Sequence, residues 1–141
     1  MIDIMDWNYC LENFIKQVEI DSEKIESIKE LVEKRIKYLN SIEINKDNVS
    51  FIVEGFYEVI KELLVALLLK KGLRSKNHQC LISYFYKNYP NYEAEARLIS
   101  RISYFRNRLN YYGEEINFEF YEKNKKDFKE IIKILKRLIK D

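Results

Sequence analysis

The stretch "NVSFIVEGFYEVIKELLVALLLKKG", residues 48–72, decides the fold of this chain. Its apolar residues recur every three or four positions, which is the period of an α-helix. Its second half is apolar on almost every side, and Gly72 stands where a helix commonly ends in a left-handed glycine. The sequence therefore predicts a long helix from about Asn48 to Lys71 that lies at the centre of a bundle.

Amphipathic patterns on both sides of this stretch predict further helices. An opening helix lies within 5–20, a long helix runs from Asp21 to about Ser41, and Ser75 is expected to cap a helix over 76–89. Another long helix covers about 92–112 and stops at Gly113, and the last covers 127–140. Short connections between long helices favour antiparallel neighbours. We expect an all-α, up-and-down antiparallel bundle of four to five main helices with a short accessory helix.

The composition is typical of a single helical domain. Of 141 residues, 47% are hydrophobic and 34% charged, and only three are glycine and one is proline. A chain of this length buries one continuous core, so we expect one domain over residues 1–141. The 25 Lys and Arg against 23 Asp and Glu leave a net charge of +2. Because so small a charge creates no global field, any surface that attracts nucleic acid must be local.

The longest apolar run, "LLVALLL" at 63–69, is far shorter than the roughly 20 residues that span a bilayer. The basic C-terminal helix has the composition of a membrane-surface element, but its apolar face is needed for the bundle core. We therefore expect no membrane association.

The two cysteines, Cys10 and Cys80, are far apart and form no CxxC motif. No cleavable signal pattern precedes them, so we expect reduced thiols, no disulfide and a cytoplasmic protein. No cluster of His and Cys has metal-ligand spacing, and no Gly-rich phosphate loop is present. The sequence predicts neither a metal site nor a cofactor.

The helix over 92–112 has an unusual polar face. Its core-facing arc is predicted to hold Leu98, Ile102, Phe105, Leu109 and Tyr112, with Arg106 at the edge. The next stripe avoids Lys and Glu and is lined instead by Ser100, Ser103, Asn107, Asn110 and Tyr111. Ser and Asn are poor helix formers, so their concentration favours close packing against a second helix or a ligand. We expect Ser100, Ser103 and Asn110 to line an interface.

The third side of this helix is basic, with one aromatic residue among three arginines: Arg97, Arg101, Tyr104 and Arg108. This combination suits phosphate contacts and base stacking, so these residues are candidates for nucleic-acid binding. A structural alternative stays open for Arg106 and its neighbours. An arginine beside an apolar stripe commonly pairs with a local carboxylate, and asparagines near a helix end often bind its last carbonyls.

Two segments resemble the HEPN family of small helical domains associated with nucleotide binding and RNA cleavage, and the resemblance covers most of the chain. "GLRSKNHQCLISYF", residues 72–85, is similar to the segment that opens the helix after the family's long central helix. "FRNRLNYYG", residues 105–113, resembles the family's Arg-polar-x-x-x-His motif, with Arg106 as the arginine and Asn107 as its polar neighbour.

The resemblance implies a homodimer whose paired helices line a cleft that cleaves RNA without metal. A guanidinium can hold the scissile phosphate while an imidazole moves protons. In this chain Tyr111 stands where the histidine is expected, and a phenol is a poor base at neutral pH. The catalytic candidates are thus Arg106, Asn107 and Tyr111, with His78 weaker because it belongs to another helix and is more readily interpreted as a helix-start or interface residue.

Three functions follow from the resemblance. The first is a dimeric HEPN-like protein of toxin–antitoxin or defence type that associates with RNA or nucleotide through a degenerate nuclease motif. The second is an active metal-independent endoribonuclease that uses Arg106 and Asn107. The third is a structural partner of a minimal nucleotidyltransferase, which in some such pairs modifies a tyrosine near the motif, here best matched by Tyr111.

Overall fold

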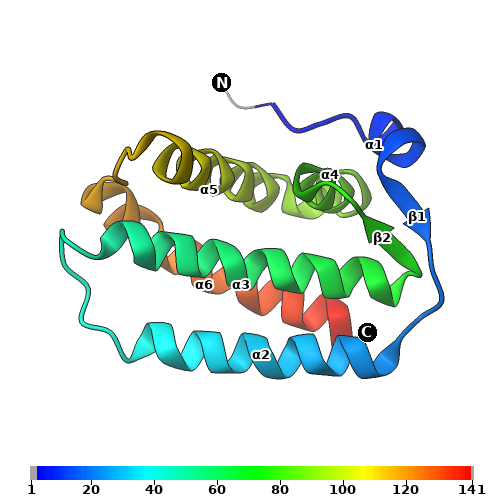
Figure 1. Cartoon of the computed structure of the whole chain (residues 1–141), viewed down its shortest axis with the longest axis horizontal. Helices are drawn as coiled ribbons and strands as arrows, with labels where there is room; N and C mark the ends of the chain where they lie inside the picture. The colour runs from blue at the N-terminus through cyan, green and yellow to red at the C-terminus, as the bar shows by residue number, and fades with distance from the viewer. Residues whose placement is uncertain (1–2, 141) are drawn as a thin grey trace.

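The computed structural model describes residues 3–140, which form six α-helices, a short 3-10 helix and a two-stranded sheet (Figure 1). The all-α prediction is confirmed, and the sheet is a small addition to it. In chain order the elements are α1 (Trp7–Asn13), β1 (Ile15–Gln17), α2 (Ser22–Asn40), α3 (Val49–Lys70), β2 (Leu73–Ser75), α4 (His78–Asn88), η1 (Pro90–Tyr92), α5 (Glu93–Tyr112) and α6 (Phe118–Lys140).

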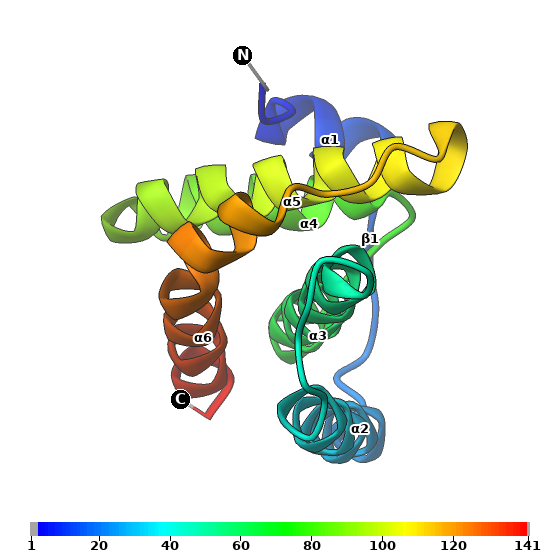
Figure 2. The ribbon, with the colours of Figure 1, turned by 90° about the vertical axis from the view of Figure 1, so that its left-hand side faces the viewer.

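Helix α3 forms the centre of the bundle, as its apolar sequence predicts. It packs against α2, α4, α5 and α6. Figure 2 looks nearly along α2 and α3 and shows α4 and α5 across one side of α3, α2 on the opposite side and α6 beside it. One side of α3 faces no other helix. We call this side the open side of α3.

The predicted boundaries of α2, α3 and α5 agree closely with the structure because local signals determine them. Asp21 caps α2 by accepting a hydrogen bond from the Lys24 N–H at 3.0 Å. Gly72 and Gly113 follow α3 and α5 with φ of 71° and 67°, a left-handed conformation that favours glycine. Helix α6 begins at Phe118, earlier than the predicted 127, because its first turns also bury Tyr121.

Two local predictions at the ends of α1 and α3 are wrong. The opening helix ends at Asn13, and residues 15–17 form a strand that pairs antiparallel with 73–75. Ser75 therefore lies in a strand and does not cap α4. The cap is Asn77, whose side chain accepts from the Gln79 N–H at 2.8 Å. The segment could not remain helical because its backbone groups are used in the ladder.

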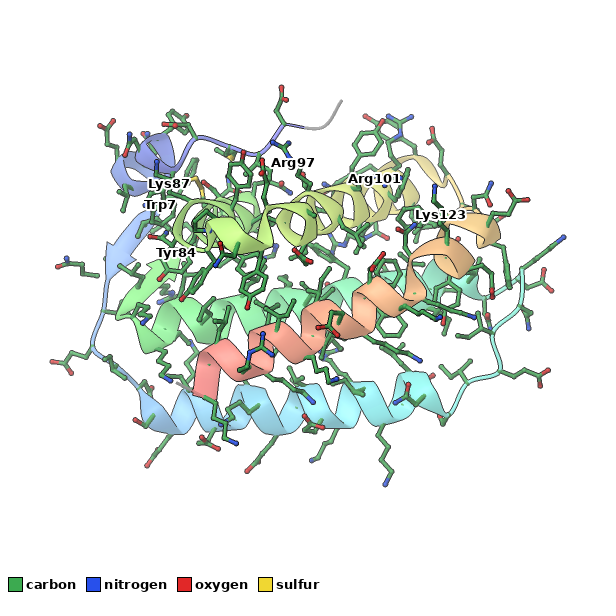
Figure 3. The ribbon with its side chains drawn as sticks, turned by 180° about the vertical axis from the view of Figure 1, so that it is seen from behind. Trp7, Tyr84, Lys87, Arg97, Arg101 and Lys123 are labelled. Carbon is green, nitrogen blue, oxygen red and sulfur yellow. A yellow bond between two sulfur atoms is a disulfide. The ribbon has the colours of Figure 1, made fainter. Side chains whose placement is uncertain are left out.

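The prediction of two free thiols is also wrong, since Cys10 and Cys80 form a disulfide with Cα atoms 5.7 Å apart. Both residues are fully buried. The bond joins α1 to the first turns of α4, and Trp7 packs edge-on against Tyr84 beside it, with ring centroids 5.3 Å apart (Figure 3). The expectation of a cytoplasmic location therefore loses the support that reduced thiols lent it. Separately, no helix within residues 3–140 is both long and apolar enough to cross a bilayer.

Candidate functional site

Helix α5 is rotated about its axis relative to the predicted orientation. Ser100 and Ser103 are only 3% and 1% exposed inside this one chain, so the prediction that they line an interface with a second subunit is wrong. Their small side chains let α5 approach α4 closely, and the Ser103 hydroxyl accepts a hydrogen bond from Gln79 at 2.8 Å. Tyr112, predicted to face the core, is 68% exposed. Arg106 consequently points toward α3.

Charged side chains from α3 and α5 meet at this point. The Lys61 ammonium lies 2.8 Å from the Glu58 carboxylate, and the Arg106 guanidinium lies 3.7 Å from the same carboxylate. All three side chains are partly buried, with 17–27% of their surface exposed. Partial burial strengthens such interactions because solvent screens them less. We call these residues, together with His78 and Asn107, the His78–Arg106 cluster.

Arg106 is held in place but keeps donors free. Its guanidinium lies 5.9 Å from the centroid of the Tyr57 ring, and Nη1 donates to the Asn107 side-chain oxygen at a long 3.4 Å. Within the described residues, its buried Nε has no partner. A guanidinium has five N–H donors, and the two Nη groups make only one long hydrogen bond and one 3.7 Å ion pair, so they keep donors for a ligand. The fork geometry of arginine suits a phosphate or carboxylate.

His78, the first residue of α4, joins the cluster from a third helix. The next residue, Gln79, is hydrogen-bonded to Ser103, which lies one turn before Arg106 on α5. The start of α4 is therefore anchored at the same level of the bundle as Arg106. The His78 side chain is partly covered by its neighbours and keeps part of its surface open to solvent.

The surroundings of His78 favour the neutral form of its imidazole. Its pKa is lowered from the usual 6.5, first by partial burial and then by the positive charge of Lys61. The Arg106 charge lowers it further, while the carboxylates of Glu58 and Glu62 oppose the effect. A neutral imidazole can accept a proton, which is the property that a general base needs.

The charges around His78 predict a titration that can be measured residue by residue. Because His78 is the single histidine, its ring signals in an NMR pH titration are unambiguous. We expect an apparent pKa below 6.5 that rises in Lys61→Met and falls in Glu58→Gln, since these variants remove opposite charges. Lys123→Met, which changes a lysine at the start of α6, is the control. A wild-type pKa above 6.5 would contradict this description of the site.

The predicted nucleic-acid-binding residues lie on the other side of α5. At 100° per residue, Arg97, Arg101, Tyr104 and Arg108 are centred about 180° around the helix from Arg106. Figure 3 labels Arg97 and Arg101 on this outer side and Lys123 at the start of α6. The structure therefore does not bring this stripe together with the His78–Arg106 cluster.

Two of the three stripe arginines also have acidic partners. Arg97 donates to Glu93 at 3.1 Å, and Arg108 donates through Nε to Glu114 at 2.9 Å. These hydrogen bonds raise the pKa of both arginines and lower that of Glu114. Arg101 instead lies 5.2 Å from the centroid of the Phe120 ring. The local carboxylates compete with phosphate for this side.

The C-terminal end of α5 stands apart from the cluster. Tyr111 is 74% exposed and lies five residues beyond Arg106, which places it about 140° around the helix. It does not share a face with Arg106 in the same chain. Asn110, the third predicted interface residue, is exposed as well. Asn107 is the one polar neighbour in the motif that contacts Arg106.

Two members of the cluster, Glu58 and Lys61, were not singled out by the sequence pattern. The available signal was the short charged stripe Glu54, Glu58, Lys61 and Glu62, which interrupts one side of an otherwise apolar helix. A central helix buried all round would carry no such stripe, so it marks the side left open by the neighbouring helices. Within residues 3–140, no group of three or more His, Cys, Asp and Glu side chains could hold a metal ion.

Comparison with known proteins adds no constraint to this geometry. No protein-family model, no curated protein and no solved structure matches the chain. The assignment of the candidate site therefore depends on its own side chains. These are the His78 imidazole, the loosely paired Arg106 guanidinium, the Lys61 ammonium and the Glu58 carboxylate, which come from three helices.

Proposed function

We propose that the chain binds RNA at the His78–Arg106 cluster and cleaves it by acid–base chemistry of its own side chains. One observation carries this proposal: Gln79, the residue after the single histidine on α4, donates to Ser103 at 2.8 Å, one turn before Arg106 on α5, so His78 and Arg106 lie at the same level of the bundle. The imidazole missing at Tyr111 is thus supplied from α4. An imidazole beside cationic groups is what cleavage of a phosphodiester by its neighbouring hydroxyl requires.

The reaction that suits these groups is internal transesterification. The neutral His78 imidazole takes the proton of a ribose 2′-hydroxyl. The 2′-oxygen attacks the adjacent phosphorus as the proton leaves. The bond from phosphorus to the 5′-oxygen breaks, and that oxygen takes a proton from water. Arg106 and Lys61 stabilise the charge on the non-bridging oxygens. The products are a 2′,3′-cyclic phosphate and a 5′-hydroxyl end.

This activity is the enzymatic form of the HEPN-like function that the sequence resemblance implies. Such a function belongs to toxin–antitoxin or defence systems and to homodimers. The two key residues here come from one chain, so each subunit of a homodimer would carry its own site. In a mixed dimer of one Arg106→Ala subunit and one His78→Ala subunit, each site would then lack one of its two residues. Mixing the two inactive variants would therefore restore no cleavage activity. Exposed Tyr111 and Tyr112, at 74% and 68%, are both open to a nucleotidyltransferase partner.

The proposal is tested with purified protein and a fluorescent RNA hexamer in buffer containing EDTA. We expect cleavage with 2′,3′-cyclic phosphate ends, reduced about 10²–10⁴-fold in His78→Ala, the range typical of a lost general base. Tyr9→Ala, an exposed aromatic on α1, is the control for handling and folding. Cleavage that is unchanged by His78→Ala would refute the assignment. RNA binding without any cleavage would instead support the non-catalytic, degenerate-motif alternative.

A further inference from the structure

A second feature lies on the same open side of α3 as the cluster. A groove of about 670 Å³ runs between α2 and α3. Its walls are mostly apolar and aromatic, with two cations and an amide: Leu31, Lys34, Arg35, Tyr38, Leu39, Ile42, Asn48, Phe51, Ile52 and Gly55. The composition of this lining identifies the kind of ligand that the groove suits.

Two aromatic rings stand exposed on opposite walls of the groove. Tyr38 on α2 is 67% exposed and Phe51 on α3 is 63% exposed. Phe side chains are normally among the most buried, so exposed Phe51 opposite Tyr38 gives the groove an apolar surface that a ligand would cover. Flat rings of this kind stack on nucleobases without regard to sequence.

The charges of the lining favour an anionic ligand. Lys34 and Arg35 line the α2 wall, and the lining contains no carboxylate. Within residues 3–140, the buried Nε of Arg35 has no hydrogen-bond partner. Glu54 and Glu62 lie on the open side of α3 but do not line the groove. A phosphate would therefore contact the α2 wall, where both cations are placed.

The groove and the His78–Arg106 cluster follow one another along the same side of α3. Phe51, Gly55 and Glu58 share one side of this helix because they are spaced four and three residues apart. At 1.5 Å per residue, Phe51 lies only about 10 Å along the axis from Glu58. A Cβ on Gly55 would come 2.6 Å from Leu39 Cδ2, so glycine allows the close approach of α2 that forms the floor.

We propose that this groove is a base-binding subsite for single-stranded RNA. A nucleotide next to the one at Arg106 enters between Tyr38 and Phe51, where its base stacks, while Lys34 and Arg35 contact a phosphate on the α2 wall. The inference rests on the proposed function, because the strand is the same one that the cluster engages. It adds a substrate class, unpaired RNA of at least a few nucleotides, and a second part of the binding surface.

The test uses an RNA hexamer with 2′-O-methyl riboses, which cannot be cleaved, and one 2-aminopurine base, whose fluorescence falls when it stacks. We expect quenching with wild-type protein. The double variant Tyr38→Ala/Phe51→Ala is expected to lose the quenching and at least about fivefold in affinity, the low end for losing one stacked base. Arg35→Gln is expected to reduce the slope of log affinity against log salt by about one. Tyr9→Ala, with an exposed ring on α1, is the matched control.

Failure of the subsite is distinguishable from failure of the proposed function. Unchanged quenching and affinity in the double variant, with affinity lost in Arg106→Ala, would overturn the subsite alone. Loss of quenching in the double variant, in a protein that cleaves no RNA, would support the subsite and count against the nuclease. A double variant that changes the oligomeric state in sedimentation while binding the hexamer normally would overturn the subsite, because the groove would then be a contact between subunits.

Discussion

Replacing Arg106 by alanine will lower the rate of RNA cleavage by about 10²–10³, the loss typical of removing one preorganised donor that stabilises developing charge. Within residues 3–140, the guanidinium makes one hydrogen bond, to Asn107 at 3.4 Å, and it lies 3.7 Å from the Glu58 carboxylate. A phosphate can therefore bind the guanidinium without breaking a close ion pair. The loss should fall mainly on kcat, because the charge on the phosphoryl oxygens is greatest in the transition state. Single-turnover cleavage of the fluorescent hexamer measures it.

Two further arginine variants sharpen this prediction. Arg106→Lys keeps the charge and loses the planar fork, so its activity should lie between those of wild type and Arg106→Ala. Arg101→Ala removes an exposed arginine from the opposite side of α5 and should leave cleavage unchanged. Equal losses in Arg101→Ala and Arg106→Ala would show that RNA is held by the outer stripe, contrary to the proposed site. Thermal unfolding of each variant separates loss of chemistry from loss of fold.

Reducing the disulfide will lower the free energy of unfolding by about 4 kcal/mol. The Cys10–Cys80 bond closes a loop with a sequence separation of 70 residues, and a cross-link of that span removes much of the conformational entropy of the unfolded chain. Urea unfolding of oxidised and reduced protein, followed by circular dichroism, measures the difference. Cys10→Ser/Cys80→Ser is expected to behave like the reduced wild type and to show no response to reductant.

An unfolding midpoint that does not respond to reductant would contradict this prediction. If the midpoint of urea unfolding is the same with and without reductant, and thiol labelling of the unfolded protein without reductant finds two free cysteines, the bond does not form in solution. The contacts of Trp7 with Tyr84 would then be left to hold α1 against α4. Mass measurement of the intact chain before and after alkylation gives an independent count of the thiols.

The helices were predictable where local chemistry decides them. The apolar period of α3, the Asp21 cap of α2 and the glycines after α3 and α5 act within a few residues, so sequence alone places these boundaries well. The strand at 15–17 was not predictable in the same way. Its partner lies at 73–75, and the ladder exists only because the bundle brings the two segments together. The disulfide escaped prediction for the same reason.

The candidate site was predictable only in part. Arg106 and Asn107 stood out because they match the Arg-polar part of the motif at the edge of the apolar arc, but the helical wheel could not show which way α5 is turned. Its orientation depends on how closely α4 approaches, which the burial of Ser100 and Ser103 determines. Glu58 and Lys61 lie about 45 residues from Arg106 in sequence and meet it only in the folded bundle. A site assembled from three helices leaves no compact motif.

The placement of α2 has a consequence for the motions of this fold. Its helix packing is with α3, and its side chains reach α6 through the ion pair between Glu33 and Lys136. A partial opening that lifts α2 away therefore leaves the packing of α3 against α4, α5 and α6 intact, and it costs less than global unfolding. A molecule bound between α2 and α3 would disfavour that opening by mass action, so occupancy of the groove would hold α2 against α3.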